Sequence, residues 1–364
     1  MARNLIAQVD LQAIASNYRL AKAQAKHAKA VAIIKADAYG HGAVAVAKSL
    51  DTEVDAFGVA AIEEAIELRE AGVRQPILLL EGFFESSELP LIDHYGFWSS
   101  LHSLEQLDML EYFLREQPDV TGLHIWLKID SGMHRLGVNP VDVDSMLSRL
   151  NALAGVEKVV VMSHFACADE PHRYHTERQL LLLQSTLQGV EYPKSFSNSA
   201  AVMQWPSAHH QWLRPGIMLY GGSPFAQAHP IADQLKAGMT LTTPIIAIRE
   251  VPAGDAVGYG ASWIADATTR IATLAVGYAD GYSRHAPSGT PVWLNGRRAS
   301  IAGRVSMDMI TIDLTGHPDA QVGDTVELWG RNLSVNEIAA CCQTIPYTLL
   351  SGLTRRVKRQ YISG

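Results

Sequence analysis

The feature of this sequence that most constrains its fold is a regular alternation of short apolar runs with helical segments up to about residue 230. The first run, residues 30–35 (AVAIIK), is almost wholly apolar, as expected for a strand buried on both faces. Similar runs follow at residues 57–61, 76–80, 96–101, 123–129, 158–163, 195–197 and 212–219. Helical patterns lie between them, for example at residues 62–71, 103–115, 143–153 and 174–188. About eight β/α units predict an α/β fold built as a parallel (β/α)8 barrel.

The pattern changes after residue 235, where β-branched runs separated by turn signals replace the strand–helix alternation. These runs are residues 240–250, 257–263, 270–276, 291–294, 301–305, 310–314 and 324–328. Asn295-Gly296 is a strong signal for a two-residue hairpin. We therefore predict a TIM-like barrel over residues 1–232, whose first residues can also pair with the second domain. Residues 233–364 are predicted to form a mostly antiparallel β domain.

The overall composition argues against several classes of partner. The 364 residues carry a formal net charge of −7, and a net acidic surface attracts neither nucleic acid nor an anionic membrane. No run approaches the ~18 consecutive apolar residues of a membrane span, and the first residues lack the apolar core of a signal peptide. The three cysteines, Cys167, Cys341 and Cys342, make a poor disulfide framework. We therefore expect a cytoplasmic protein.

Polar side chains follow several of the expected barrel strands. Active sites of this barrel lie at the carboxyl ends of its strands, so these side chains are expected to converge there. The set contains the following residues: Lys35, Lys128, His164, Asn198, Ser199 and Arg214. Its cations and hydroxyls are suited to an anionic cofactor. The 14 histidines show no HxH or HExxH spacing at strand ends, so no metal site is predicted.

Lys35 is the most informative member of this set. A lysine at the end of a buried strand is partly desolvated, which favours its neutral, nucleophilic amine. A lone lysine in this place would more often extend its ammonium group to solvent. The residues that follow it, in IIKADAYGHG (33–42), favour the functional interpretation.

That motif is the first of an ordered series through which the chain resembles the alanine racemase family. The series continues with KIDSGMHRLG (128–137), SHFACAD (163–169), SNSAA (197–201), RPGIMLYG (214–221), VGYGASW (257–263), VGYADGY (276–282), GRVSMDM (303–309) and PYTLLSGLTRRVKR (346–359). The resemblance extends over essentially the whole chain. It implies interconversion of L-alanine and D-alanine, either to supply D-alanine for cell-wall peptidoglycan or for alanine breakdown, and the sequence does not decide between these roles.

The resemblance also implies the cofactor and the two acid/base groups. Lys35 would carry pyridoxal 5'-phosphate on its amine and exchange the proton on the D-alanine side. Tyr259 would act on the L-alanine side, reaching the site from the partner in a head-to-tail homodimer with composite active sites. Racemisation needs proton removal on one face and return on the other, so two groups must flank the α-carbon. Without its motif, Tyr259 would be taken for an ordinary strand tyrosine.

Further roles are implied by the same resemblance. Arg214 would face the pyridine nitrogen and, because it stays charged, disfavour protonation of that nitrogen. Phosphate and ring contacts would come from Tyr39, Asn198, Ser199, Gly216, Ile217 and Tyr347. Arg135 would contact the cofactor oxygen and the substrate carboxylate, with Met307 and Asp308 beside that carboxylate. Residues lining the substrate entrance would be Asp169, Tyr278, Arg284, Arg304 and Ile345. A narrow entrance predicts a preference for alanine over larger amino acids.

Two positions leave alternatives open. Lys128 is either carbamylated, which would give it a negative charge able to hold Arg135, or a plain lysine paired with Asp130 or another carboxylate. His164 would orient Arg214 or Tyr259 through a hydrogen bond, or have only a structural role. Ser306 and Thr348 depart from residues common in the family, which bears on substrate range and the subunit contact.

Other functions were weighed against alanine racemisation. A broader-specificity pyridoxal-phosphate racemase, or an amino-acid decarboxylase of the same build, would share the barrel. Decarboxylases generally favour a protonated ring nitrogen, so Arg214 argues against them. A non-catalytic pyridoxal-phosphate carrier would lack a second domain, so the β domain predicted at residues 235–364 argues against it.

Overall fold

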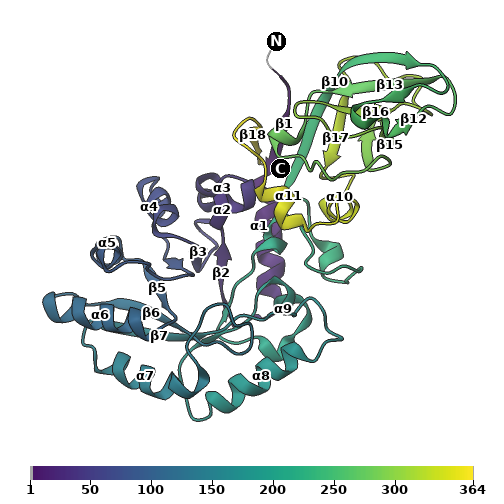
Figure 1. Ribbon diagram of the computed structural model, residues 1–364. Helices are drawn as coiled ribbons and strands as arrows, with labels where there is room; N and C mark the ends of the chain where they lie inside the picture. Colours follow the sequence, from purple (N-terminus) through teal and green to yellow (C-terminus); the bar gives the residue numbers. More distant parts are fainter. Residues whose placement is uncertain (1–2, 364) are drawn as a thin grey trace.

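A computed structural model describes residues 3–363 and contains the predicted eight-stranded parallel barrel (Figure 1). Each barrel strand pairs with its neighbours in the order β8-β7-β6-β5-β4-β3-β2-β9. The amide of Arg214 donates to the carbonyl of Ser197 at 2.9 Å and so joins the two end strands. The strands are β2 (Lys29–Ile33), β3 (Ala56–Val59), β4 (Ile77–Leu79), β5 (Trp98–Leu101), β6 (Leu123–Lys128), β7 (Val156–Met162), β8 (Lys194–Ser195) and β9 (Trp212–Leu213).

Helices alternate with these strands, as the sequence predicts, and lie around the outside of the barrel (Figure 1). They are α1 (Leu11–Ala23), α2 (Lys35–Gly40), α3 (Ala43–Leu50), α4 (Ile62–Glu70), α5 (Leu89–Tyr95), α6 (Leu104–Glu116), α7 (Val143–Ala152), α8 (His175–Thr186) and α9 (Ser199–Gln204). The Ser103 hydroxyl caps α6 by accepting the amide of Gln106 at 3.2 Å. One prediction was wrong: the strand expected at 212–219 ends at Leu213, and a 3-10 turn, Ile217–Tyr220, follows the Pro215-Gly216 bend.

The second domain is a twisted, mostly antiparallel sheet, which agrees with the predicted fold class. Its long strand β10 pairs with both β13 and β17, so six strands close into a small barrel. The strands are β10 (Met239–Val251), β13 (Thr269–Leu274), β14 (Pro291–Leu294), β15 (Arg297–Ile301), β16 (Ile310–Asp313) and β17 (Thr325–Trp329). Strand β1 (Ile6–Asp10) pairs antiparallel with β10 and parallel with β18 (Lys358–Ile362). Two short helices, α10 (Val335–Cys341) and α11 (Pro346–Ser351), follow the sheet.

The hairpin expected at Asn295-Gly296 is confirmed, and two neighbouring expectations were wrong. Leu294 pairs with Arg297, and both turn residues have positive φ, as a type I′ turn requires. The strand expected at 257–263 is two short strands, β11 (Ala256–Val257) and β12 (Trp263–Ile264), joined by a 3-10 turn at Tyr259–Ala261. Gly258 and Gly260, with φ of 78° and 75°, bend the chain there. The strand expected at 301–305 is also displaced: β15 ends at Ile301, and residues 302–305 are loop.

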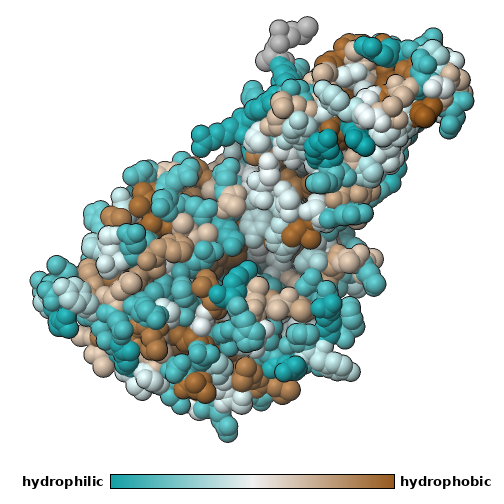
Figure 2. All heavy atoms as spheres, in the orientation of Figure 1, coloured by the Kyte–Doolittle hydropathy of each residue, from teal (hydrophilic) through white to brown (hydrophobic). Residues whose placement is uncertain are grey.

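The molecule has two lobes joined by the first strand, the start of β10 and the C-terminal segment (Figure 2). Most of the buried apolar side chains of both lobes form one continuous core. A small separate cluster lies behind the 3-10 turn that carries Tyr259. Among the residues described, no helix is both long and apolar enough to cross a lipid bilayer.

Candidate active site

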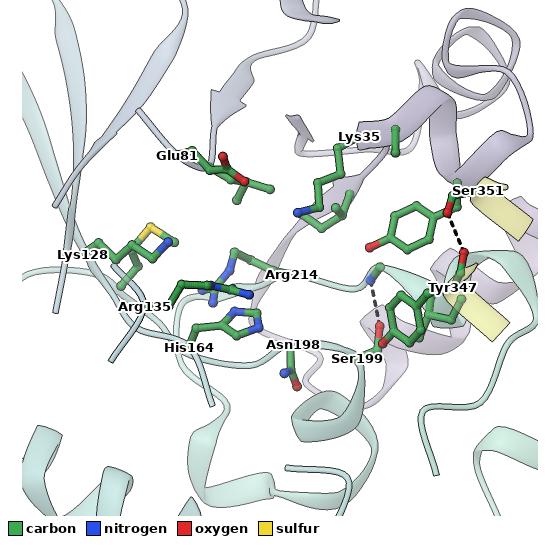
Figure 3. A pocket seen from close by; sticks show the side chains of 17 residues that line it. Lys35, Glu81, Lys128, Arg135, His164, Asn198, Ser199, Arg214, Tyr347 and Ser351 are labelled. Carbon is green, nitrogen blue, oxygen red and sulfur yellow. Dashed lines mark hydrogen bonds between the residues drawn. The ribbon is translucent and has the colours of Figure 1, made fainter. Parts of the chain in front are cut away.

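A cavity of about 370 Å³ lies at the carboxyl ends of the barrel strands, where a barrel enzyme is expected to bind its substrate (Figure 3). The side chains predicted to bind the cofactor converge on it from strand ends distant in sequence. Those lining it are Lys35, Tyr39, Lys128, Arg135, His164, Asn198, Ser199, Arg214, Gly216, Ile217 and Tyr347. Tyr347 comes from α11, so the C-terminal segment closes one side of the cavity.

The charge of the cavity favours an anionic ligand. Lys35, Lys128, Arg135 and Arg214 bring four cations to its wall, against the single carboxylate of Glu81. Burial, followed by the charges of Arg214 and Arg135, lowers the pKa of Lys128 to about 8. Such mutual destabilisation of cations is relieved when a multiply charged anion binds among them.

Arg214 is held rigidly at the base of the cavity. Its side chain is only 3% exposed, and its Nη1 donates to the carbonyl and hydroxyl oxygens of Ser195 at 2.6 and 2.7 Å. Nη2 donates to the carbonyl of Ser163 at 2.5 Å. These bonds occupy the terminal nitrogens and leave Nε–H as the remaining donor. Burial lowers the pKa of Arg214 to about 10, which keeps the guanidinium charged at neutral pH.

A set of donors suited to a phosphate lies at the side of the cavity away from Lys128, beside the Pro215-Gly216 bend (Figure 3). The Ser199 hydroxyl is 2.8 Å from the amide of Gly216 and 3.4 Å from that of Met218. A Cβ placed on Gly216 would come within 2.8 Å of the Tyr39 hydroxyl, so only glycine leaves this approach open. The rings of Tyr39 and Tyr347 lie 5.8 Å apart, and burial raises the pKa of both phenols, which remain hydrogen-bond donors.

The structure can be compared with the partners that were expected for Lys128 and His164. The Asp130 carboxylate accepts from the amides of Gly132 and His134, both at 3.0 Å, and from the His134 ring at 2.9 Å. Lys128 is therefore not paired with Asp130, because this carboxylate is turned toward its own loop; the other carboxylate that acts on Lys128 is that of Glu81, whose charge raises the Lys128 pKa. Burial, then the charge of Arg214, holds the pKa of His164 well below its ordinary value, so the ring is neutral. The Arg214 donors go to serine residues rather than to His164.

Two polar residues of the cavity wall were missed by the sequence reasoning. Glu81 follows β4 at the same barrel end, and its charge opposes the lowering of the Lys128 pKa. It comes directly after the apolar run LLL, so the strand-end pattern that marks Lys35 also marks Glu81. Ser351 lies at the end of α11, inside the motif at residues 346–359 in which only Tyr347 was given a role, and its hydroxyl donates to the Tyr347 carbonyl at 2.7 Å.

The remaining predicted site residues do not line the cavity of their own chain. They are Tyr259, Met307, Asp308, Asp169, Tyr278, Arg284, Arg304 and Ile345. Five of them form what we call the β-domain loop cluster: Tyr259, Tyr278, Arg304, Met307 and Asp308. The amide of Tyr278 donates to the Ser306 carbonyl at 3.0 Å, and a Cβ on Gly260 would lie 2.9 Å from Arg304 Nη1. Arg356 fixes Asp308 with a 2.6 Å ion pair.

The fold and the cavity together define a class of protein: two-lobed barrel enzymes that hold an anionic cofactor beside a lysine at the strand ends. Comparison with known proteins identifies the family within this class. Residues 9–224 match the alanine racemase N-terminal domain, and residues 238–361 match the alanine racemase C-terminal domain. The chain belongs to the alanine racemase family and is an isomerase. The C-terminal match also excludes the alternative of a carrier protein that has only the barrel.

Individual relatives cover nearly the whole chain. An alanine racemase of Pseudomonas fluorescens is 51% identical over 98% of this chain and 99% of its own. A catabolic alanine racemase of Pseudomonas aeruginosa is 52% identical over 98% of both chains. The crystal structure of the biosynthetic alanine racemase of P. aeruginosa superposes with a TM-score of 0.94 at 48% identity, covering 99% and 100%. That of Bartonella henselae with covalently bound pyridoxal phosphate has a TM-score of 0.90 at 29% identity and covers 100% of both chains.

Proposed function

We propose that this protein interconverts L-alanine and D-alanine with pyridoxal 5'-phosphate bound covalently to Lys35. The observation that carries the proposal is the convergence of one strand-end lysine, a buried arginine and a phosphate-sized set of donors in a single cavity. Ser199, Tyr39, Tyr347 and the amides near Gly216 would hold the phosphate. When bound, pyridoxal 5'-phosphate withdraws electrons from the α-carbon of an amino acid and makes its proton acidic.

The chain's own residues move the proton. Lys35 Nζ removes or returns the α-proton on the D-alanine side of the substrate. The phenolic oxygen of Tyr259 of the partner subunit does so on the opposite side. Placing one group on each face is the requirement for inverting a stereocentre, and both groups are held by the protein before the substrate enters.

Arg214 favours racemisation over competing reactions. Its guanidinium is charged and fixed by Ser195 and Ser163, so Nε–H can donate to a ring nitrogen but cannot accept a proton from it. By leaving the ring nitrogen of a bound cofactor unprotonated, Arg214 would limit the negative charge that the ring can take up. Proton return to the substrate carbon is therefore favoured over transfer elsewhere.

The β-domain loop cluster supports a homodimer with shared sites. Tyr259 is 70% exposed and Met307 is 53% exposed in the single chain, although both are assigned to the reaction. Large apolar or aromatic side chains that are this exposed to solvent on one surface are typical of a contact with another protein chain. We propose a two-fold dimer in which each loop cluster covers the cavity of the partner, bringing Tyr259 to the α-carbon of the substrate and the Met307 amide to the substrate carboxylate beside Arg135.

We also propose that Lys128 is carbamylated. In the reaction its neutral amine attacks carbon dioxide, a C–N bond forms, and one proton leaves to solvent. The resulting carbamate carries a negative charge among Arg214, Arg135 and Lys35, the cations that otherwise destabilise a charged lysine there. The side chain is 7% exposed, so a lysine without such a change would leave a buried cation beside other cations.

The cavity contains two lysines, Lys35 and Lys128, so the proposal that the cofactor is bound to Lys35 can be tested. Protein saturated with pyridoxal 5'-phosphate is reduced with borohydride and mapped by peptide mass spectrometry. We expect the label on Lys35, at wild-type yield in Lys128→Ala and at background in Lys35→Ala. In parallel, alanine incubated in heavy water exchanges its α-proton and racemises only with protein that keeps Lys35. A label on Lys128, or racemisation by Lys35→Ala, contradicts the assignment.

A panel of amino acids tests the substrate. The relatives of this chain are named for alanine, and in the proposed dimer Tyr347 and the partner's Tyr259 would narrow the entrance, which disfavours side chains larger than a methyl group. We expect kcat/KM for serine to fall below that for alanine by about one order of magnitude or more. Comparable rates for lysine or arginine would favour the broader-specificity alternative.

A further inference from the structure

The segment that follows Lys35 has an unusual backbone. Ala36, Asp37, Ala38 and Tyr39 have φ between 52° and 54° and ψ between 41° and 52°, so α2 is a turn of left-handed helix. None of the four is glycine, and left-handed backbone brings Cβ close to the next carbonyl oxygen. Such residues normally occur singly, so a run of four persists only when its surroundings hold it.

His41 holds the end of this turn from inside the protein. The ring is completely buried, and its Nδ1 lies 3.0 Å from the carbonyl oxygens of both Ala38 and Tyr39. Both partners are acceptors, so the proton of the neutral ring is on Nδ1. The His41 ring packs at a tilt against Tyr220, with ring centroids 4.5 Å apart, and Tyr220 stacks on Tyr39 at 4.8 Å. The Tyr220 hydroxyl donates to the Ile33 carbonyl at 2.8 Å, just before Lys35.

Glu64 holds the start of the turn from outside. One carboxylate oxygen accepts the amide of Ala36 at 2.6 Å, and the other accepts the amide of Ala60 at 2.8 Å. Glu64 lies in the first turn of α4, directly after β3. The carboxylate therefore ties the peptide after Lys35 to the end of the neighbouring barrel strand. Ala36 is the residue next to Lys35, so this bond acts on the main chain of the lysine itself.

We propose that His41 and Glu64 are positioning residues that hold the left-handed turn Ala36–Tyr39 and thereby aim Lys35 and Tyr39 into the cavity. His41 acts on the carbonyls at the end of the turn, and Glu64 acts on the first amide. Neither side chain lines the cavity. The inference rests on the proposed role of Lys35, but the backbone restraint can be measured without it.

The test uses four variants of the full-length protein with its cofactor. His41→Leu removes the donor, while His41→Asn keeps one near the position of Nδ1. Glu64→Ala removes both acceptor oxygens, and Glu63→Ala is the matched control, because Glu63 is exposed and adjacent on the same helix. Amide exchange of the segment 33–42 is followed by mass spectrometry, and kcat and KM for alanine are measured on the same samples.

We expect His41→Leu and Glu64→Ala to raise exchange of this segment about tenfold, with little change in distant barrel strands. Their kcat should fall about tenfold or more while KM changes less than about threefold, because a displaced lysine affects proton transfer more than binding. His41→Asn should keep most of the activity, and Glu63→Ala should match the wild type in both readouts.

A fifth variant tests whether backbone conformation is the cause. Glycine adopts left-handed φ without the Cβ contact, so Ala36→Gly combined with Glu64→Ala should recover about threefold or more of the lost kcat. Exchange and kcat that stay at wild-type values in His41→Leu and Glu64→Ala would overturn the proposal. A fall in kcat without faster exchange in segment 33–42, or without glycine rescue, would also overturn it. Failure of borohydride to label Lys35 in wild type would instead contradict the proposed function, whatever the exchange shows.

Discussion

At the scale of single residues, burial decides which groups of this protein carry charge. Lys128 and His41 are both titratable, both nearly or fully buried, and both have pKa values lowered first by burial. For Lys128 the three surrounding cations Arg214, Arg135 and Lys35 outweigh the Glu81 carboxylate, so the neutral amine is favoured further. For His41 the surroundings are aromatic rings and backbone carbonyls, which suit a neutral donor.

The lowered pKa of Lys128 leads to a prediction about carbon dioxide. With a pKa of about 8, about one amine in ten is neutral at pH 7, against fewer than about one in a thousand for an ordinary lysine. We expect ¹³C-bicarbonate to give one carbamate resonance in wild-type protein and none in Lys128→Ala. Lys158→Ala, which removes a mostly exposed lysine, is the control and should keep the resonance. A resonance that survives in Lys128→Ala would place the carbamate elsewhere.

The lowered pKa of His41 makes folding stability depend on pH. Burial lowers its pKa to about 4, so between this value and the ordinary 6.5 the unfolded chain binds more protons than the folded one. The stability that comes from neutral His41 is therefore complete above pH 6.5 and is lost as pH falls toward 4. From pH 7 to pH 5 the free energy of unfolding should decrease by about 2 kcal/mol more in wild type than in His41→Asn. Chemical unfolding at both pH values measures this difference. An equal decrease of the unfolding free energy in wild type and His41→Asn would contradict the prediction.

At the scale of elements, the sequence reveals cavity residues where a polar residue directly follows an apolar barrel strand. Lys35, Arg214 and Glu81 all follow apolar barrel strands, and all line one cavity. Local propensity fails where the backbone is unusual. Ala-Asp-Ala-Tyr has no glycine or proline, so nothing in its composition indicates the left-handed turn of α2. The turn at Tyr259 interrupts the strand expected at residues 257–263 because Gly258 and Gly260 adopt positive φ, and glycine in a strand pattern does not by itself fix where the chain bends.

The junction of β1 with α1 gives a prediction on the scale of an element. Asp10 caps α1 by accepting the amide of Ala13 at 2.9 Å, and its other oxygen pairs with Arg331 of the β domain at 2.9 Å. Asp10→Ala should lower the free energy of unfolding by about 1–2 kcal/mol, and Asp10→Asn by about 0.5 kcal/mol, because asparagine also caps helices. Arg331→Gln removes only the ion pair and should resemble Asp10→Asn. Thermal and urea unfolding of the three variants measures these losses. Equal losses of unfolding free energy in Asp10→Ala and Asp10→Asn would contradict a capping role.

At the scale of the whole molecule, the two lobes divide the proposed chemistry between subunits. The barrel supplies Lys35 and the residues around it, and the other lobe carries Tyr259 and Met307 on its exposed loop cluster. Because a single chain holds the two groups on separate surfaces, each proposed site needs a second copy. In this proposed arrangement the dimer contact would be part of the active site, and its loss should abolish activity without unfolding either lobe.

Subunit mixing tests this arrangement directly. Lys35→Ala and Tyr259→Phe dimers are each inactive, but random exchange puts half of the chains into mixed dimers with one intact site, restoring about a quarter of wild-type activity. The reciprocal mixture supplies the control. Wild type exchanged with the double variant should lose about half of its activity, because mixed dimers pair each Lys35 with a phenylalanine. If Tyr259 served the cavity of its own chain, the first mixture would stay inactive and the second would keep full activity.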